Sequence, residues 1–134
     1  MDLTKAFEDI YRENAWGGNE SLSGPGSGLN TTKAIRRALP HLIEKYQIKT
    51  FLDAPCGDFF WMKELVPVLT PLLDQYIGVD IVSTVVQQNT ERYGNEKFSF
   101  RNMDITREAL PKADLIFTRD CFLHLSYENI IKAL

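Results

Sequence analysis

The sequence contains few cysteines and histidines, and it has no long apolar run. Of its 134 residues, two are cysteine and two are histidine. Two cysteines cannot form a disulfide framework, and they cannot supply the four ligands of a structural zinc site. No apolar stretch approaches the roughly 20 residues that a membrane-spanning helix needs. We therefore expect neither a metal site nor a membrane span.

The charge distribution argues against nucleic acid as a partner. The formal net charge is −3, and the longest basic run is the pair Arg36-Arg37. Phosphate backbones are bound by clustered lysines and arginines, which this sequence lacks. The first residues mix acidic and basic side chains without the apolar core of a signal peptide. We expect a cytoplasmic protein that binds neither nucleic acid nor membrane.

The composition is that of an ordinary globular domain, with 44% hydrophobic and 25% charged residues. We expect one domain over residues 1–134. Residues 1–30 predict a short amphipathic helix followed by a loop rich in glycine and serine, and residues 31–134 form the core. The loop is either a flexible linker or a lid over a ligand, anchored by Trp16 and Leu22.

Residues 31–134 alternate between helical and strand patterns. A helix is predicted over 31–46, which Pro40 kinks or divides, and a second over 59–66, which Pro67 stops. The other predicted elements are strands at 50–54, 75–81, 97–102 and 114–118, and helices over 83–93 and from 126 onward. Strands that alternate with helices form a parallel sheet through right-handed crossovers. The sequence therefore predicts an α/β fold.

Polar residues follow each of the four predicted strands. Asp53 ends the first strand before a turn that contains Gly57, and Asp80 ends the second. Asp104 follows the third strand, and the pair Arg119-Asp120 follows the fourth. The carboxyl ends of parallel strands share one edge, where ligands of such sheets bind. A glycine turn lets backbone approach a ligand, and an aspartate after the second strand can accept hydrogen bonds from ribose hydroxyls.

These segments together resemble the class I S-adenosylmethionine-dependent methyltransferases. Asp53-Ala54-Pro55-Cys56-Gly57-Asp58 is similar to their first motif, and Gly78-Val79-Asp80 resembles the acidic end of their second strand. Asn102-Met103-Asp104-Ile105 is similar to the segment beside the adenine, and residues 114–120 resemble the fourth strand, with residues 121–125 as the apolar start of the next helix. The resemblance implies a Rossmann-like parallel sheet in the order 3-2-1-4, flanked by helices, and S-adenosylmethionine as cofactor.

The resemblance also implies which residues bind the cofactor. The first motif would hold its methionine part through Asp53, Ala54, Pro55, Cys56 and Gly57. Asp80 would bind the ribose hydroxyls with Ile81 against the adenine, and Asp104 and Ile105 would contact the adenine amine and ring. Arg119 would lie beside the amino acid moiety. An aspartate at a strand end is also a common cap or turn former, and this alternative stays open for Asp80 and Asp104.

Two residues are candidates for a general base, Asp120 and His124, because they follow the fourth strand where acceptor-facing groups often lie. Each has a structural alternative. His124 stands between Leu123 and Leu125 and could be a packed helix histidine. Asp120 could cap a helix or pair with Arg119.

The sequence departs from the family in two respects. Pro55 and Asp58 stand where glycines are usual, and the strands that normally follow the fourth are missing. An unpaired apolar edge on the fourth strand would invite pairing, so we expect either a homodimer that covers this edge or a truncated protein.

We expect methyl transfer to a small-molecule or sugar-like acceptor. The alternative is a truncated domain that binds the cofactor, or only folds, without turnover. A nicotinamide-dependent oxidoreductase is disfavoured, because the turn after the first strand lacks a Gly-x-Gly-x-x-Gly pattern.

Overall fold

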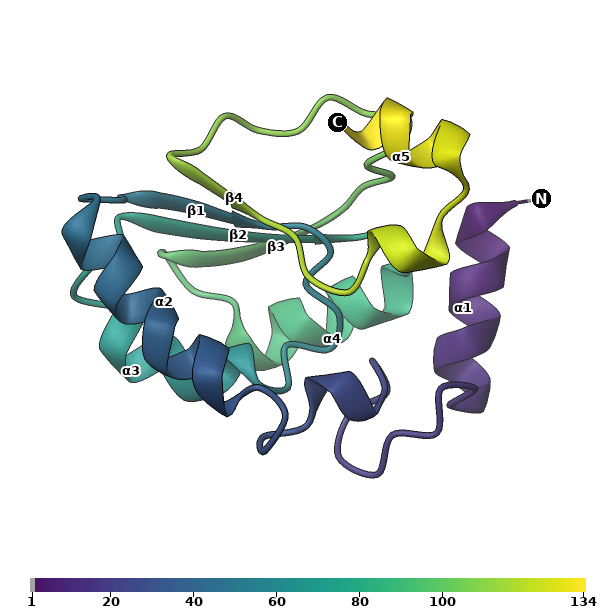
Figure 1. Cartoon of the computed structure of the whole chain (residues 1–134), viewed down its shortest axis with the longest axis horizontal. Helices are drawn as coiled ribbons and strands as arrows, with labels where there is room; N and C mark the ends of the chain where they lie inside the picture. Colours follow the sequence, from purple (N-terminus) through teal and green to yellow (C-terminus); the bar gives the residue numbers. More distant parts are fainter. Residues whose placement is uncertain (1) are drawn as a thin grey trace.

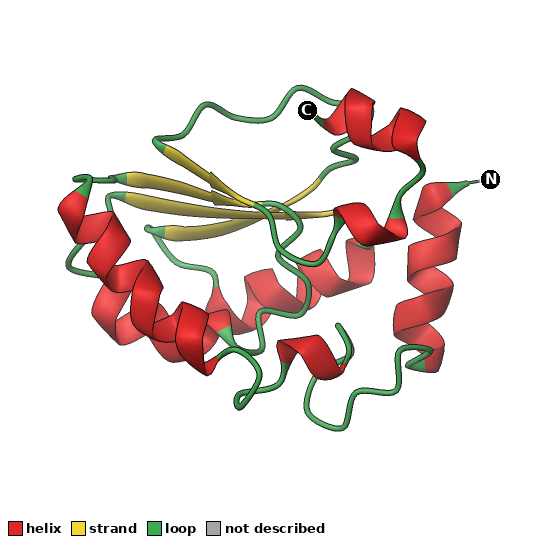
Figure 2. Ribbon diagram, viewed as in Figure 1, coloured by secondary structure: helices red, strands yellow, loops and turns green. Residues whose placement is uncertain are grey.

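The computed structural model describes residues 2–134, and its centre is a four-stranded parallel sheet. The strands are β1 (Thr50–Asp53), β2 (Gln75–Asp80), β3 (Phe98–Asn102) and β4 (Leu115–Phe117). They lie in the order β3-β2-β1-β4, and every neighbouring pair is parallel. This confirms the predicted α/β fold with a Rossmann-like sheet and its strand order (Figure 2).

Helices lie on one side of this sheet and at the ends of its strands. The helices are α1 (Leu3–Glu13), α2 (Lys33–Lys45), α3 (Val66–Leu69), α4 (Ser83–Tyr93) and α5 (Tyr127–Ala133). In Figure 1, α2, α3 and α4 lie on the same side of the sheet, whereas the connection from β3 to β4 crosses the other side. Helix α1 packs beyond the carboxyl end of β2, where Tyr11 contacts the buried Val82 and Val85.

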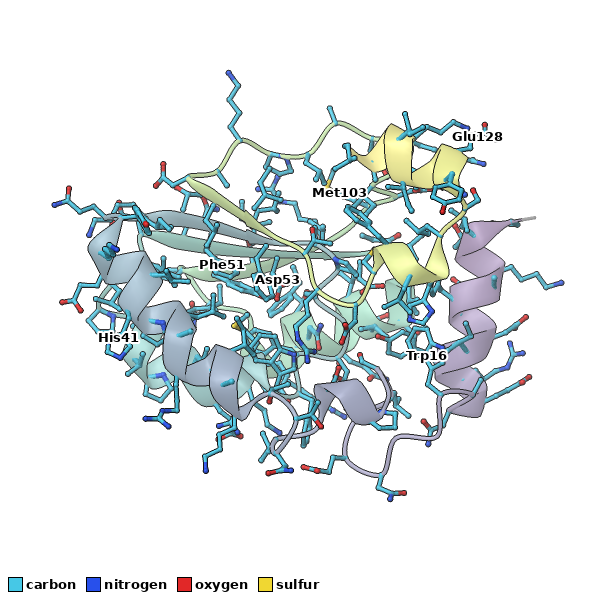
Figure 3. All side chains as sticks on the ribbon, in the orientation of Figure 1. Trp16, His41, Phe51, Asp53, Met103 and Glu128 are labelled. Carbon is cyan, nitrogen blue, oxygen red and sulfur yellow. The ribbon has the colours of Figure 1, made fainter. Side chains whose placement is uncertain are left out.

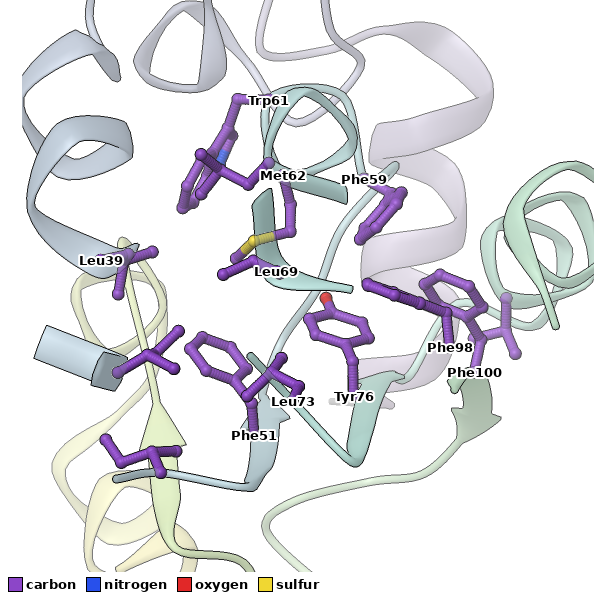
Figure 4. Packing of buried hydrophobic residues seen from close by; sticks show 14 residues of the cluster. Leu39, Phe51, Phe59, Trp61, Met62, Leu69, Leu73, Tyr76, Phe98 and Phe100 are labelled. Carbon is purple, nitrogen blue, oxygen red and sulfur yellow. The ribbon is translucent and has the colours of Figure 1, made fainter. Parts of the chain in front are cut away.

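Side chains that alternate along the strands build an apolar layer on each face of the sheet. On the helix side, Phe51 of β1 stacks on Tyr76 of β2 with ring centroids 5.6 Å apart, in the cluster drawn in Figure 4. On the other side, Leu52 and Ile77 pack with Met103 and other residues of the β3–β4 connection. The two central strands, β1 and β2, are therefore buried on both faces even though helices cover one of them.

The predictions that Pro40 divides a helix and that Pro67 stops one were wrong, while a kink at Pro40 stays a prediction. Helix α2 runs unbroken through Pro40. A proline removes one intrahelical hydrogen bond, but Leu39 and Ile43, 2% and 1% exposed, hold this helix against the core on both sides of that position. The helix expected over 59–66 is a 3₁₀ turn, Met62–Leu65, and Pro67 stands in the first turn of α3 instead of stopping a helix. A proline there loses no hydrogen bond.

Strand β4 is an edge of the sheet. Its central residue, Ile116, is 54% exposed, and Tyr127 and Ile131 of α5 are also exposed. The pairing of this edge with a second copy of the chain stays a prediction. No helix among residues 2–134 is both long and apolar enough to cross a membrane.

A buried carboxyl group ends β1. Asp53 is 3% exposed, and one of its oxygens accepts a hydrogen bond of 2.6 Å from the Tyr76 hydroxyl. Burial raises the pKa of Asp53 from 3.8 to about 7, because the hydrogen bond from Tyr76 only partly offsets the loss of solvation and the charge of Asp80 adds to the rise. The folded protein therefore binds a proton at Asp53 more tightly than the unfolded chain does.

The sign of this shift predicts how stability changes with pH. Between pH 4 and pH 8, ionisation of Asp53 should lower the free energy of unfolding by up to about 4 kcal/mol, because the unfolded chain loses its proton first. Asp53→Asn removes the ionisation, so the free energy of unfolding of the variant, relative to that of the wild type, should increase as the pH rises. Urea unfolding at pH 4.5 and pH 8 measures this, with the exposed Asp74→Asn as control. An Asp53→Asn effect that is equal at both pH values would contradict the assignment.

Candidate functional site

A pocket lies at the carboxyl ends of the strands, between the sheet, α1 and the 3₁₀ turn Phe122–His124. Every predicted site residue except Ala54 lines it; these are Asp53, Pro55, Cys56, Gly57, Asp80, Ile81, Asp104, Ile105, Arg119, Asp120 and His124. The Ala54 side chain packs instead with Leu52 on the face of the sheet that the β3–β4 connection covers. The structure therefore brings the predicted residues together, while the cofactor role of each stays a prediction.

Asp80 organises the turn after β1 as well as the start of α4. It is 5% exposed. Its two oxygens accept hydrogen bonds from the backbone N–H groups of Gly57, at 3.0 Å, and Val82, at 3.1 Å. Burial raises the pKa of Asp80 to about 6, although these backbone hydrogen bonds act in the opposite direction. A carboxylate oxygen accepts two hydrogen bonds, so Asp80 combines the turn-forming role with free acceptor capacity toward the pocket.

Gly57 occupies a position where a residue other than glycine would be strained. Its φ of +56° is in the left-handed region, and a Cβ there would collide with the Ser23 hydroxyl. Its carbonyl oxygen accepts a hydrogen bond of 2.8 Å from the buried Asn89 side chain. The turn is thus fixed on both sides, with its backbone against the pocket.

Cys56, the preceding residue, is not activated as a nucleophile. Loss of solvation raises the pKa of its thiol well above the ordinary value, and the charges of Asp80 and Asp53 raise it further. A nucleophilic cysteine needs the opposite shift. Cys56 lines the pocket as a small apolar side chain.

Asp104 forms a turn, so the structural alternative holds for this residue. Its Oδ1 accepts hydrogen bonds from the Thr106 backbone N–H, at 2.9 Å, and hydroxyl, at 2.7 Å. Its own N–H donates to the Glu108 carboxylate at 2.6 Å. The second oxygen, Oδ2, lies 3.7 Å from the Arg107 guanidinium. Asp104 also lines the pocket, and its contact with an adenine stays a prediction.

Arg119 is engaged with two partners at the edge of the pocket. Its Nη1 donates to the Gly26 carbonyl oxygen at 3.0 Å and lies 3.0 Å from the Asp120 carboxylate. The guanidinium also lies over the Trp61 ring, 5.8 Å from its centroid. The pairing of Asp120 with Arg119, which the sequence left open, is present. Arg119 therefore also holds the N-terminal loop.

His124 is not a packed helix histidine. It lies in a 3₁₀ turn, exposed to solvent. Its ring stacks on Trp16, with centroids 4.9 Å apart and planes inclined by 27°. Figure 3 marks Trp16 near the end of α1 and Asp53 in the sheet. This contact joins the N-terminal segment to the chain that follows β4, across the mouth of the pocket.

Sequence reasoning missed Asp58 as a partner of the N-terminal loop. Its carboxylate accepts hydrogen bonds from the Ser21 hydroxyl, at 2.8 Å, and the Leu22 backbone N–H, at 3.0 Å. The loop is therefore attached to the turn after β1, while its role as a lid stays a prediction. Of the two expected anchors, Trp16 packs on His124 and Gly24, whereas the Leu22 side chain is 39% exposed. The one available signal was Asp58 itself, an acidic residue where the motif that this turn resembles usually has glycine.

No protein-family model matches the chain. Over 55 residues, the chain is 46% identical to the phosphoethanolamine N-methyltransferase of Plasmodium falciparum (isolate 3D7). The aligned segment covers 39% of this chain and 21% of that protein, so it spans about a fifth of the relative's length. This partial likeness and the parallel sheet fit a methyltransferase fold, and they support methyl transfer in general.

Proposed function

We propose that the chain binds S-adenosylmethionine in this pocket and transfers its methyl group to a small-molecule or sugar-like acceptor. One observation carries the proposal. The buried Asp80 carboxylate holds the Gly57 turn by its backbone N–H while both residues line the pocket. Such a carboxylate beside a close backbone turn fits a nucleoside with free ribose hydroxyls. The partial likeness to a methyltransferase supports the choice of nucleoside.

The charge of the pocket suits this cofactor. Asp53, Asp80, Asp104 and Asp120 line it, and among residues 2–134 Arg119 is the one lysine or arginine that does. A sulfonium cation is therefore favoured by the local field. When bound, S-adenosylmethionine supplies an electrophilic methyl group. The chain would contribute orientation for an in-line displacement, which accounts for much of the acceleration in such reactions.

We assign the acceptor side of the pocket to Trp16, Asp120 and His124, which are among its lining residues. A hydroxyl or protonated amine must lose a proton for methyl transfer, and Asp120 and His124 are the proposed bases. The relative is named for phosphoethanolamine, which carries an amine and a phosphate. Arg119 would have to share its N–H donors between a phosphate and its present partners, Asp120 and Gly26. We therefore take the amine or hydroxyl as the group to test first.

A domain that binds the cofactor without turnover is the second candidate. The observation behind it is the extent of the likeness, which covers 21% of the methyltransferase. Its sites for acceptor and base need not be contained in that segment. Cofactor titration and a turnover assay, made on the same preparation, separate the two functions.

The first test is calorimetric titration with S-adenosylhomocysteine. Asp80→Asn should weaken binding by about 30-fold or more, because it removes charge-assisted hydrogen bonds to the ribose that each contribute roughly 1.5–3 kcal/mol. Asp74→Asn, an equal charge change on the exposed surface, should leave affinity unchanged. A folded wild-type sample that binds nothing would end the proposal, and so would an unchanged affinity in Asp80→Asn.

The affinity should also depend on pH. Hydroxyl donors require ionised Asp80, whose pKa is about 6 in the free protein. The affinity for S-adenosylhomocysteine should therefore rise about tenfold from pH 5 to pH 7.5. At pH 5, binding should release a proton from Asp80, because the ionised carboxylate accepts the hydrogen bonds of the ribose hydroxyls. Titration in buffers of different ionisation enthalpy measures the proton release. In Asp80→Asn the pH dependence should flatten; a wild type with a flat profile would contradict the role of Asp80.

The third test concerns the base. Conversion of S-adenosylmethionine to S-adenosylhomocysteine is followed with phosphoethanolamine, ethanolamine and simple sugars as acceptors. If His124 or Asp120 is the base, His124→Ala or Asp120→Asn should lower kcat by roughly 10²–10⁴-fold while the cofactor Kd stays within threefold. A variant that retains kcat is excluded as the base. Cofactor binding without turnover of any acceptor favours the second candidate.

A further inference from the structure

We propose that hydrogen bonds to Asp58, here called the clasp, hold residues 14–28, here called the strap, closed over the pocket. Opening of the strap would then control how fast the cofactor enters and leaves. Asp58 is thus a positioning residue and touches no reacting atom. The control of cofactor exchange rests on the proposed function. The clasp itself does not, because it is a property of the cofactor-free protein.

Asp58 binds three consecutive residues of the strap. Ser21 donates its hydroxyl to both carboxylate oxygens at 2.8 Å, and the Leu22 backbone N–H donates at 3.0 Å. The Ser23 hydroxyl follows at 3.4 Å. On its own side, Asp58 accepts from the Phe60 N–H at 3.2 Å. Hydrogen bonds to an ionised acceptor are among the strong ones, and these link segments about 36 residues apart in the sequence.

Outside the bonds to Asp58, the strap buries little side-chain surface. Its buried residues are glycines and a serine: Gly18, Ser21, Gly24 and Gly28. Its largest aliphatic side chain, Leu22, is 39% exposed, and the main apolar contact of the strap is made by Trp16, which packs on Phe7 and Tyr11 of α1. A segment with few buried apolar contacts belongs to the low-stability end of a protein and opens locally. The bonds to Asp58 therefore hold the middle of the strap, residues 21–23.

The remaining contacts tie the ends of the strap to the elements around the pocket. The Ser23 hydroxyl shares a hydrogen bond of 2.6 Å with the Tyr11 hydroxyl of α1. The Gly26 carbonyl accepts from Arg119, which follows β4. At the first end, Trp16 packs on Gly24 and stacks on His124. The contacts with Tyr11, Arg119 and His124 each join the strap to a different element around the pocket.

The clasp lies directly beside the proposed cofactor turn. Asp58 follows Gly57, and Ser23 lies so close to Gly57 that a Cβ there would collide with its hydroxyl. Trp16, Ser23 and Ser27 of the strap line the same pocket as Asp80. In this proposal a ligand seated against Gly57 lies next to the strap, and opening of the bonds to Asp58 widens its path.

Hydrogen–deuterium exchange of the cofactor-free protein tests the clasp. In Asp58→Asn and in Ser21→Ala, amides of residues 14–28 should exchange about tenfold faster or more than in the wild type, because the closed strap loses its charged acceptor or a donor. Peptides from β2 and α4 should exchange as before, which shows that the fold is intact. Asp74→Asn is the matched control. Unchanged exchange of the strap in both variants would overturn the clasp.

Stopped-flow binding of S-adenosylhomocysteine tests the control of exchange. If the strap must open for passage, both the association and the dissociation rate constants should rise in Ser21→Ala, with a smaller change in Kd. If the clasp only stabilises the bound state, dissociation should become faster while association stays equal or becomes slower. That result would overturn the proposal that the strap controls cofactor exchange. If the wild type does not bind S-adenosylhomocysteine at all, the proposed function and the control of cofactor exchange both fail. The hydrogen–deuterium exchange data still show whether Asp58 holds the strap.

Discussion

The burial of two carboxyl groups at the ends of neighbouring strands is the constraint on which the site depends. Asp53 and Asp80 are 3% and 5% exposed, and an ionised group out of water is costly unless hydrogen bonds compensate. Tyr76 supplies one donor to Asp53. The backbones of Gly57 and Val82 supply donors to Asp80. The need to solvate Asp80 thus fixes the glycine turn and the start of α4 together, and the pocket is the space between them.

Asp58 shows how a third carboxylate can serve another purpose a few residues away. Asp80 takes its donors from the motif and from α4, whereas Asp58 takes its donors mainly from the N-terminal loop. Because Asp58 directly follows Gly57, the loop and the turn cannot move independently. A glycine at position 58 would leave the loop without its acceptor. Asp58, which stands where the motif that this turn resembles usually has glycine, therefore adds a connection between the N-terminal loop and the turn after β1.

The parts of this structure that could be predicted are those encoded locally. Apolar runs that end in Asp53 and Asp80 identify two strands and show where their carboxyl ends lie. This was predictable because the run and the aspartate that ends it are only a few positions apart in the sequence. The expected division of α2 at Pro40 was wrong, because the burial of Leu39 and Ile43 outweighs the one hydrogen bond that a proline removes. The contact between Ser21 and Asp58 joins residues 37 positions apart, and no periodicity signals a side-chain pair across a loop.

The two halves of the pocket differ in how firmly the fold holds them. Asp53 and Asp80 stand on β1 and β2, the two central strands, whose side chains are buried on both faces. Asp120 and His124 stand after β4, an edge strand, and both are exposed. Geometry held by the buried strands tolerates change at the edge. In the proposed function, a cofactor site on β1 and β2 could therefore persist while the proposed acceptor side varies, so binding and transfer would be separable, and the residues after β4 would decide whether the second accompanies the first.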